Sequence, residues 1–335
     1  MLLGLFTNIA YYYLNDPEDN GCYNSLREFS FAINLCYIHF PKHTSGNEGL
    51  FPLDKNDGNV AMNVLTLGTC CVDVYPEKAM ITPGGEALNI AAQLSHREDV
   101  NVYIMGMIGI DEYADFLNSS ISCLAINKDY LYQTEGKTAN QIIKITADGD
   151  RYFEEGSWDS GVSALFKVSS DDEVLLDTID IVYTTLWEPN LPELVRLKKE
   201  KGFKLAVDFD IQRDFSQWSD IIDELDIFHI SGDENLGREL LSKSESSDTM
   251  FVMTLAEQGS RVYYKGEMYS CDAFAVEQVE DTTGCGDCYL GNFGVEFLKT
   301  GNIHQSMEIA SREASNVTAH VGGFVSLIPN LALNH

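Results

Sequence analysis

Residues 280–300 read EDTTGCGDCYLGNFGVEFLKT, and this stretch decides the fold of the chain. A glycine-rich turn comes first, and the apolar residues Leu290, Phe293 and Phe297 then recur at the spacing of one helix face. Lys299 fits the last turn of such a helix because cations are favoured there. The stretch therefore predicts a turn that opens a helix.

The start of this helix has the chemistry of an anion site with an acid beside it. If Gly284, Cys285 and Gly286 form the first turn, their backbone N–H groups and the positive end of the helix dipole point at one place, which suits a phosphate. Asp287 would lie beside that place, where a carboxylate is unfavourable unless it accepts a proton from an attacking hydroxyl. The alternative is a glycine-rich helix cap with a solvated Asp287, and the pattern G-x-G-D alone does not separate the two.

The whole string D-T-T-G-C-G-D resembles the carboxyl-terminal signature D-T-x-G-A-G-D of the ribokinase-like (PfkB) carbohydrate kinases, with Cys285 at the alanine position. The resemblance implies that Gly284, Cys285 and Gly286 surround the transferring phosphoryl group and that Asp287 is the catalytic base. Cysteine is small enough at position 285 to keep the backbone geometry that alanine has in the family signature. Its thiol makes the site a candidate for oxidation.

The composition is strongly acidic. The 335 residues carry a formal net charge of −30, with a pI near 4.3. Nucleic acid requires a basic protein surface and anionic membranes attract basic segments, so we expect neither as a partner. An anionic nucleotide must then be held by local N–H groups and metal rather than by the overall field of the protein.

The eight cysteines are scattered through the chain. The first basic residue is Arg27, so the amino terminus lacks the charged region of a signal peptide. We therefore expect a cytoplasmic protein with reduced thiols, rather than disulfides or a zinc site.

Residues 1–61 differ from the rest of the chain. They open with an apolar run that is too short to span a bilayer, and residues 15–59 show no sustained helix or strand period. The first clean strand pattern begins at Met62. We therefore expect Met62 to be the native start, and residues 1–61 to be an N-terminal extension of doubtful authenticity without a role in catalysis.

From Met62 the chain alternates short β-branched runs with amphipathic stretches, which is the rhythm of βαβ units and a parallel sheet. The expected strands cover residues 63–67, 102–105, 181–184, 204–207, 226–230 and 251–254. The resemblance implies the ribokinase-like fold over residues 62–335: a three-layer α/β/α sandwich with a mainly parallel central sheet and a small β lid.

A second signature follows the first expected strand. The string G-x-x-x-x-D ending at Asp73 is followed by P-G-G-x-x-x-N ending at Asn89. Taken singly, Asp73 is a turn residue and Asn89 a solvent-facing helix residue. Together the strings resemble the amino-terminal sugar-binding signature of the same family. That resemblance implies that Asp73 and Asn89 hydrogen-bond sugar hydroxyls, while Gly84 and Gly85 let the backbone approach the sugar.

A hairpin is expected in the first half of the domain. Residues 141–146 and 151–154 are two strand patterns joined by an Asp-Gly turn signal. The resemblance implies that this hairpin belongs to a lid over the sugar, near residues 138–155. Asn140, at the entry of the hairpin, would then face the substrate.

Candidate metal ligands follow two of the expected strands. Asp208 and Asp210 form D-x-D at a strand end, a position compatible with metal or phosphate binding. Relatives often carry N-x-x-E after the next strand, with the Glu reaching Mg²⁺ through water. Here Ser231 replaces the Asn, Glu234 falls at the Glu position, and Asp233 is the alternative ligand. Without a metal, Ser231 and Glu234 are a helix capping box.

The nucleotide site is expected near the carboxyl end of the chain. The string T-L-A-E-Q-G from Thr254 to Gly259 resembles the family's T-L-G-x-x-G. This implies that Thr254 and Gly259 line the nucleotide site together with Thr282 and the glycines of the turn. The adenine would lie between this loop and a closing helix over residues 303–320, where we expect His320 to be structural.

The sequence therefore predicts an ATP-dependent kinase, assisted by Mg²⁺, that phosphorylates the primary hydroxyl of a sugar. The stretches PGGEALNIA, IDIVYTTLW and AVDFD also resemble members of the family that phosphorylate fructosamines at the 6-position, which makes Glu86 and Glu188 candidate partners for the amine of the substrate. The alternatives are another hexose or nucleoside kinase, and a noncatalytic sugar sensor that kept the fold. The sequence leaves open a monovalent cation and a homodimer.

Overall fold

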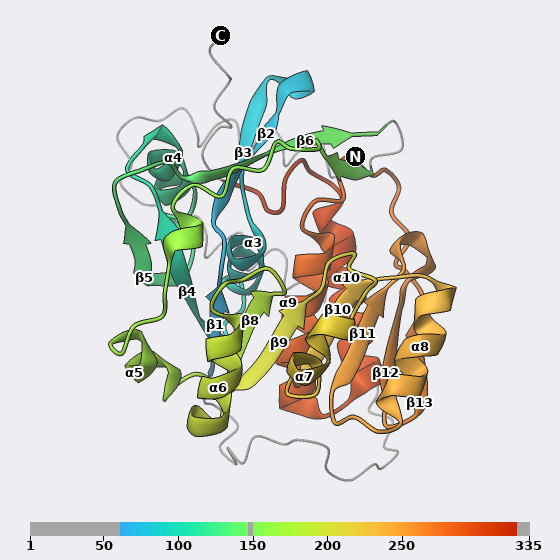
Figure 1. The fold of residues 1–335 in the computed structure, drawn as a ribbon. Coiled ribbons are helices and arrows are strands. Elements are labelled where there is room, and N and C mark those ends of the chain that lie inside the picture. The colour runs from blue at the N-terminus through green and yellow to red at the C-terminus, as the bar shows by residue number, and fades with distance from the viewer. Residues whose placement is uncertain (1–60, 147–149, 327–335) are drawn as a thin grey trace. The chain divides into compact units, whose positions relative to one another are not determined.

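The computed structural model describes residues 61–146 and 150–326, and the elements named below lie within these ranges. They form a large sheet and a small one (Figure 1). The large sheet has nine strands in the order β13-β12-β11-β10-β9-β8-β1-β4-β5. Its strands are β1 (Met62–Leu67), β4 (Val100–Ile108), β5 (Ile126–Gln133), β8 (Ile181–Thr185), β9 (Lys204–Asp208), β10 (Ile227–Ser231), β11 (Met250–Thr254), β12 (Ser260–Tyr264) and β13 (Glu267–Cys271).

Neighbouring strands of the large sheet run parallel from β5 to β11, and the β11–β12–β13 edge is antiparallel. The central strands are apolar along their length because helices cover both faces, and every residue of β8 is buried. The strands expected from the βαβ rhythm are confirmed. The edge strand β5 was not predicted, because its sequence INKDYLYQ is polar and only its first residue is buried.

Helices cover the two faces of the large sheet, which confirms the three-layer sandwich. One face carries α3 (Glu86–Leu94), α4 (Glu112–Ser120), α9 (Cys285–Thr300) and α10 (Ile303–Val317). The other face carries α5 (Asp172–Leu176), α6 (Leu191–Lys201), α7 (Ser219–Ile222) and α8 (Glu234–Ser244). Successive strand residues enter opposite cores, as Val64 and Leu65 of β1 do, because side chains alternate across a sheet.

The small sheet lies beyond the carboxyl end of β1 and has the order β3-β2-β6-β7 (Figure 1). Its strands are β2 (Cys71–Tyr75), β3 (Met80–Gly84), β6 (Ala139–Ile145) and β7 (Arg151–Phe153). The β6–β7 pair confirms the expected hairpin, whose predicted turn at residues 147–149 lies outside the described residues.

The other half of the small sheet corrects the sequence interpretation. Asp73 lies within β2 rather than in a turn after a strand, because residues 71–84 fold back as an antiparallel pair. No strand was predicted at residues 80–84. Pro83 fits in β3 because this strand is at the edge of the sheet, where a missing N–H is tolerated. The lid therefore has two parts, and β2 joins them by pairing with both β3 and β6.

Helix α9 is buried on almost every side, since each residue from Asp287 to Leu298 is buried. The rings of Tyr289, Phe293 and Phe297 stack along it, with neighbouring centroids 6.1 Å apart. A helix that is apolar all round belongs in a protein interior. Packing between α3 and α10 therefore fixes the position of the α9 amino terminus against the sheet.

Two helix ends differ from expectation. α10 ends at Val317 rather than at His320, and a turn follows. The cap of α8 is Asp233, whose carboxylate accepts from the N–H groups of Asn235 and Leu236. Ser231 is the last residue of β10, so the expected capping box with Glu234 is wrong.

Residues 1–60 lie outside the described residues, and so does the expected extension except for Ala61. Among the residues that the structure describes, none of the helices combines the length and apolar character needed to cross a bilayer.

Candidate active site

The turn before α9 is held by its own side chains. Asp281 is fully buried and accepts hydrogen bonds from the N–H and hydroxyl of Thr283, from the hydroxyl of Tyr75 and from the N–H of Gly322. Its carboxylate thereby joins the turn to β2 and to the loop after α10. Four donors on one carboxylate leave little freedom to this turn.

Gly284 begins α9 with a φ of 80°, a left-handed conformation that favours glycine. A Cβ at this position would lie 2.6 Å from Cα of Gly323, so the turn also packs directly against the last loop. The N–H of Cys285 donates to the carbonyl of Thr282 at 3.2 Å. The N–H groups of Gly284 and Gly286 have no acceptor among the described residues, which leaves them available to an anion.

Asp287 lies in the first turn of α9 and is 8 % exposed. Its Oδ2 accepts a hydrogen bond of 2.7 Å from the side-chain amide of Asn89 on α3. Burial raises the pKa of Asp287 to about 7, while the amide of Asn89 opposes that rise by stabilising the ionised form. The structure thus brings together one residue from each of the two sequence signatures, and it excludes a solvated Asp287.

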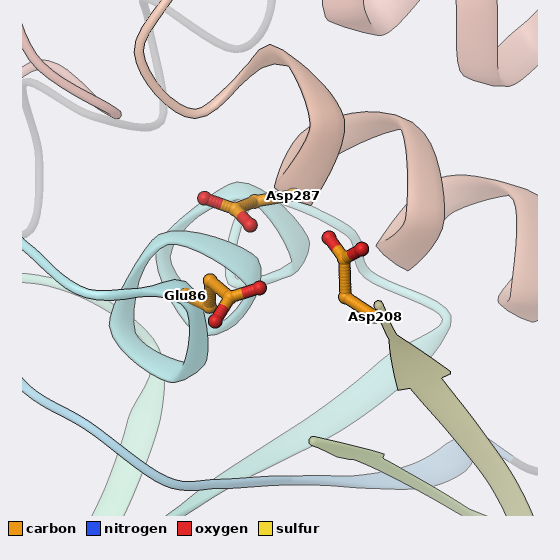
Figure 2. Close-up of side chains that lie close together, drawn as sticks. All are labelled: Glu86, Asp208 and Asp287. Atoms are coloured by element: carbon orange, nitrogen blue, oxygen red, sulfur yellow. The ribbon is translucent and has the colours of Figure 1, made fainter. Parts of the chain in front are cut away.

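Two more acids surround Asp287, and Figure 2 shows how the three side chains converge. Glu86 of α3, Asp208 at the end of β9 and Asp287 each place a carboxylate oxygen within 4.8 Å of the other two. Nδ1 of the buried His229 lies 3.1 Å from Oδ1 of Asp208. Three carboxylates at this distance repel one another unless a proton or a cation intervenes.

The pKa shifts indicate how the protein balances these charges. Burial, followed by the charge of Asp208, raises the pKa of Glu86 well above its usual value. Burial opposes ionisation of Asp208, but the charge and hydrogen bond of His229 hold its pKa below the usual value. The pKa of His229 is raised by Asp208 against the effect of burial. Burial and Asp208 thus favour the neutral form of Glu86, whereas Asp208 and His229 stabilise each other's charged forms. The three carboxylates are also close enough to share a divalent cation.

The other predicted sugar ligands lie in the small sheet. Asp73 is 4 % exposed, and burial raises its pKa to about 7. A Cβ at Gly84 would lie 2.1 Å from Oδ2 of Asp73, so this glycine is required by the carboxylate and not only by a sugar. Asn140 of β6 is bridged to Asp159 through two backbone hydrogen bonds, and its register partner Val72 precedes Asp73. Asp73 and Asn140 therefore lie on neighbouring strands, but their side chains leave opposite faces of the small sheet, because the register partner of Asp73 is Gln141.

Cys285 is a poor candidate for oxidation. Burial raises the pKa of its thiol to about 12, so little reactive thiolate exists at neutral pH. Cys288 completes a C-x-x-C spacing with Cys285, so these two cysteines are an exception to the scattered distribution. Cys288 is fully buried, and burial raises its pKa further. Neither thiol is part of a disulfide, and the same holds for the other four described cysteines.

The two predicted metal residues, Asp233 and Glu234, line a surface pocket, whereas Thr282 and the glycines of the turn before α9 are not part of its lining. Gly232, Asp233, Glu234, Asn235, Leu255 and Gln258 line it. Thr254 and Gly259 flank this lining, and the carbonyl of Thr254 accepts from the N–H of Gly232 at 3.0 Å. Carboxylates that border a pocket fit the hard oxygen donors that Mg²⁺ prefers. Asp233 already caps α8, however, and Glu234 is paired with Arg261 at 2.5 Å.

Sequence reasoning missed the partners that topology supplies. Glu86 had been considered only as a partner for an amine, whereas its carboxylate lies in the cluster with Asp208 and Asp287. His229 lies in the strand IFHIS and matches no motif. The position of Asp208 at a strand end was a usable signal, since open α/β sheets bind ligands at that edge.

Comparison with known proteins gives the site a context. Residues 67–329 match the family described as pfkB family carbohydrate kinase. Fructoselysine 6-kinase of Escherichia coli (strain K12) is 28% identical over 234 residues, which cover 68% of this chain and 86% of that protein. Fructosamine kinase FrlD of Bacillus subtilis (strain 168) is 24% identical over 278 residues, which cover 78% of this chain and 93% of that protein.

Solved structures have the same fold. A ribokinase of Arabidopsis thaliana, complexed with ribose and ATP, superposes with a TM-score of 0.66 at 17% identity and covers 78% of this chain and 94% of that one. An adenosine kinase of Sinorhizobium meliloti superposes with a TM-score of 0.66 at 20% identity, and the match covers 82% of this chain and 98% of that one. The fold is therefore ribokinase-like, as predicted. With most of its length matched, the chain belongs to the pfkB family of carbohydrate kinases.

Proposed function

We propose that this carbohydrate kinase transfers the γ-phosphoryl group of ATP to the primary 6-hydroxyl of a fructosamine of the fructoselysine type. The observation that carries the proposal is the hydrogen bond between Asn89 and Asp287, which joins a predicted sugar ligand to the predicted base. Two relatives whose names specify fructoselysine and fructosamine support the substrate class.

In this mechanism Asn89 and Asp73 hold hydroxyls of the sugar beneath the lid. The 6-hydroxyl lies against the carboxylate of Asp287, which takes its proton as the new O–P bond forms. The bond between the γ-phosphorus and the bridging oxygen breaks at the same time, and ADP leaves. A base with a pKa of about 7 suits this step near neutral pH.

The turn before α9 stabilises the phosphoryl group in transit. The unpaired N–H groups of Gly284 and Gly286 point to the charge that develops on it, and the α9 dipole adds to their effect. The loop from Thr254 to Gly259 and the side chain of Thr282 bind the rest of the nucleotide. When bound, Mg²⁺ would neutralise phosphate charge, and Asp233 and Glu234, which line the pocket but already have partners in the protein, would hold it through water.

The amine of the substrate requires a partner away from Asp287, since it is attached to C1, at the opposite end of the six-carbon chain from the 6-hydroxyl. Glu86 lies in the cluster with Asp287, beside the 6-hydroxyl in this mechanism, so we assign the amine to Glu188. Its Oε1 accepts from the backbone and side chain of Asn190, whereas its Oε2 accepts from no described residue. Oε2 lies 3.5 Å from the Cβ position of Gly68, at the end of β1.

A coupled ADP-release assay over a sugar panel tests the proposal. We expect the highest kcat/KM with fructoselysine or another fructosamine, and lower values with fructose, ribose and adenosine. A preference for ribose or adenosine would favour the reactions named for the structural relatives and would overturn the substrate assignment. If none of the sugars on the panel led to ADP release, the result would indicate a protein that binds sugar without phosphorylating it.

A further inference from the structure

The active site is short of positive charge for the reaction that it performs. Asp73, Glu86, Asp208 and Asp287 converge near the turn before α9. A nucleotide triphosphate brought to these acids adds more negative charge, and the overall charge of −30 gives no help. Of the nearby cations, His229 is already committed to Asp208. The site therefore needs a second cation that is free to meet phosphate.

Arg151 of the lid strand β7 has the right position. Its positive charge lowers the pKa of Asp73, Asp210, Cys285 and Asp287. Coulomb interactions weaken with distance, so this guanidinium lies on the side of the molecule where β2, the end of β9 and the start of α9 meet.

Two contacts hold Arg151 in this place. The neighbouring Asp150 accepts a hydrogen bond of 3.1 Å from the hydroxyl of Thr282, which joins the lid to the turn before α9. The guanidinium carbon lies 4.6 Å from the ring centroid of Phe153, a cation–π distance. Within the described residues the guanidinium forms no ion pair. Lys144 on the adjacent strand β6, by contrast, is paired with Glu154 at 3.1 Å.

We propose that Arg151 is a further catalytic residue, whose guanidinium binds the nonbridging oxygens of the phosphoryl group as it passes from ATP to the sugar. A guanidinium suits this work because it is always charged and its planar N–H groups match two phosphate oxygens at once. The inference rests on the proposed placement of phosphoryl transfer at Asp287. If Arg151 binds the phosphoryl group, the contact between Asp150 and Thr282 helps to position the guanidinium, because it holds the residue before Arg151 against the turn before α9.

Steady-state kinetics of Arg151→Gln and Arg151→Lys test the inference. For Arg151→Gln we expect kcat to fall about 10²- to 10³-fold, as on loss of a donor to transition-state charge, with the KM for sugar changed less than about threefold. The kcat of Arg151→Lys should lie between those of the wild type and Arg151→Gln, since lysine keeps the positive charge but lacks the planar N–H groups that bind two oxygens at once. Millimolar guanidinium chloride should restore part of the activity of Arg151→Ala. Lys144→Gln is the matched control, because it removes a lid cation that is already paired, and its kcat should stay near the wild-type value.

Three results would overturn the inference. A rise in the KM for sugar with unchanged kcat would make Arg151 a sugar ligand. Equal loss in Arg151→Gln and Arg151→Lys, with a lower melting temperature and no rescue by guanidinium, would make it structural. Wild-type kcat and KM in both variants would show that Arg151 has no role in the reaction. Asp287→Asn, measured in parallel, separates these outcomes from failure of the proposed site: if Asp287→Asn retains activity, the placement of the reaction itself is wrong.

Discussion

The side-chain amide of Asn89 lies 2.7 Å from Oδ2 of Asp287, although 198 residues separate them in the chain. The contact joins the first turns of α3 and α9, two helices that pack side by side on one face of the sheet. Asn89 thereby influences both the orientation and the acidity of the acid to which we assign the chemistry.

Replacement of Asp287 by Asn should remove turnover while sugar binding remains. We expect kcat to fall at least about 10³-fold, because a positioned base and its charge are both lost. ADP release measures the rate, and calorimetry with the sugar measures the affinity. Asp115→Asn changes an exposed acid in the first turn of α4 and serves as the control. Turnover close to wild type in Asp287→Asn would exclude the assigned role.

The pH dependence should report the acidity of Asp287. Its raised pKa of about 7 means that the active, ionised form appears as the pH rises through neutrality, so kcat/KM should increase over that range. Asn89 stabilises the ionised form, and Asn89→Ala should therefore move the acid limb of the profile to higher pH. An acid limb that stays in place or moves to lower pH would contradict this account.

Asp73 should reduce stability at alkaline pH. Burial raises its pKa from 3.8 to about 7, so keeping this carboxyl protonated costs the folded state more free energy as the pH rises from about 4 to about 7, and the cost is constant above that. Asp73→Asn should therefore raise the free energy of unfolding at pH 8 by on the order of 4 kcal/mol, since the shift is about three pKa units and one unit corresponds to about 1.4 kcal/mol. At pH 5 only part of this cost has accumulated, so the gain should fall to on the order of 2 kcal/mol. Urea unfolding at the two pH values measures it, and equal effects at both would refute the explanation.

Glu188 should distinguish fructosamines from plain sugars. Glu188→Gln removes the charge opposite the amine, and we expect the KM for fructoselysine to rise about tenfold, equivalent to about 1.4 kcal/mol, while the KM for fructose stays constant. Glu193→Gln, in the first turn of α6, is the control because its carboxylate is paired with Arg196. A parallel rise for both sugars would show that Glu188 acts on the fold or on the common ring.

The thiol of Cys285 should not be needed. Cys285→Ala restores the residue of the resembled signature, and kcat should stay within about twofold of wild type because no thiolate takes part. The exposed Cys123 should react with iodoacetamide first, and its modification should leave activity intact. Rapid inactivation by the reagent in a Cys123→Ser variant would show that Cys285 is more accessible than its burial implies.

Local patterns predicted the elements well. The helical spacing after Asp287 and the apolar run of β8 are signals within a few residues, and both elements formed as expected. β2 and β3 were not predicted, because short strands that contain Pro and Gly resemble loops in sequence. Their place in the lid becomes clear only from the pairing of β2 with β3 and β6. Asp73 was identified by its motif although its secondary structure was wrong.

The composition of the site was harder to predict, because topology rather than spacing assembles it. Glu86 and Asp208 come from a helix and a strand far apart in sequence, and no motif relates them. Arg151 was visible as part of a hairpin, but its relation to Asp287 depends on how the lid folds over the sheet.

The loop at Gly322 and Gly323 supports the turn before α9 from another part of the chain. Gly322 donates to Asp281, Gly323 packs on Gly284, and the carbonyl of Gly323 accepts from the side chain of Gln93. The turn before α9 is thus braced by a loop that follows α10 and lies outside both signatures. A substitution in that loop should therefore alter the amino terminus of α9 although every residue of the signature is kept.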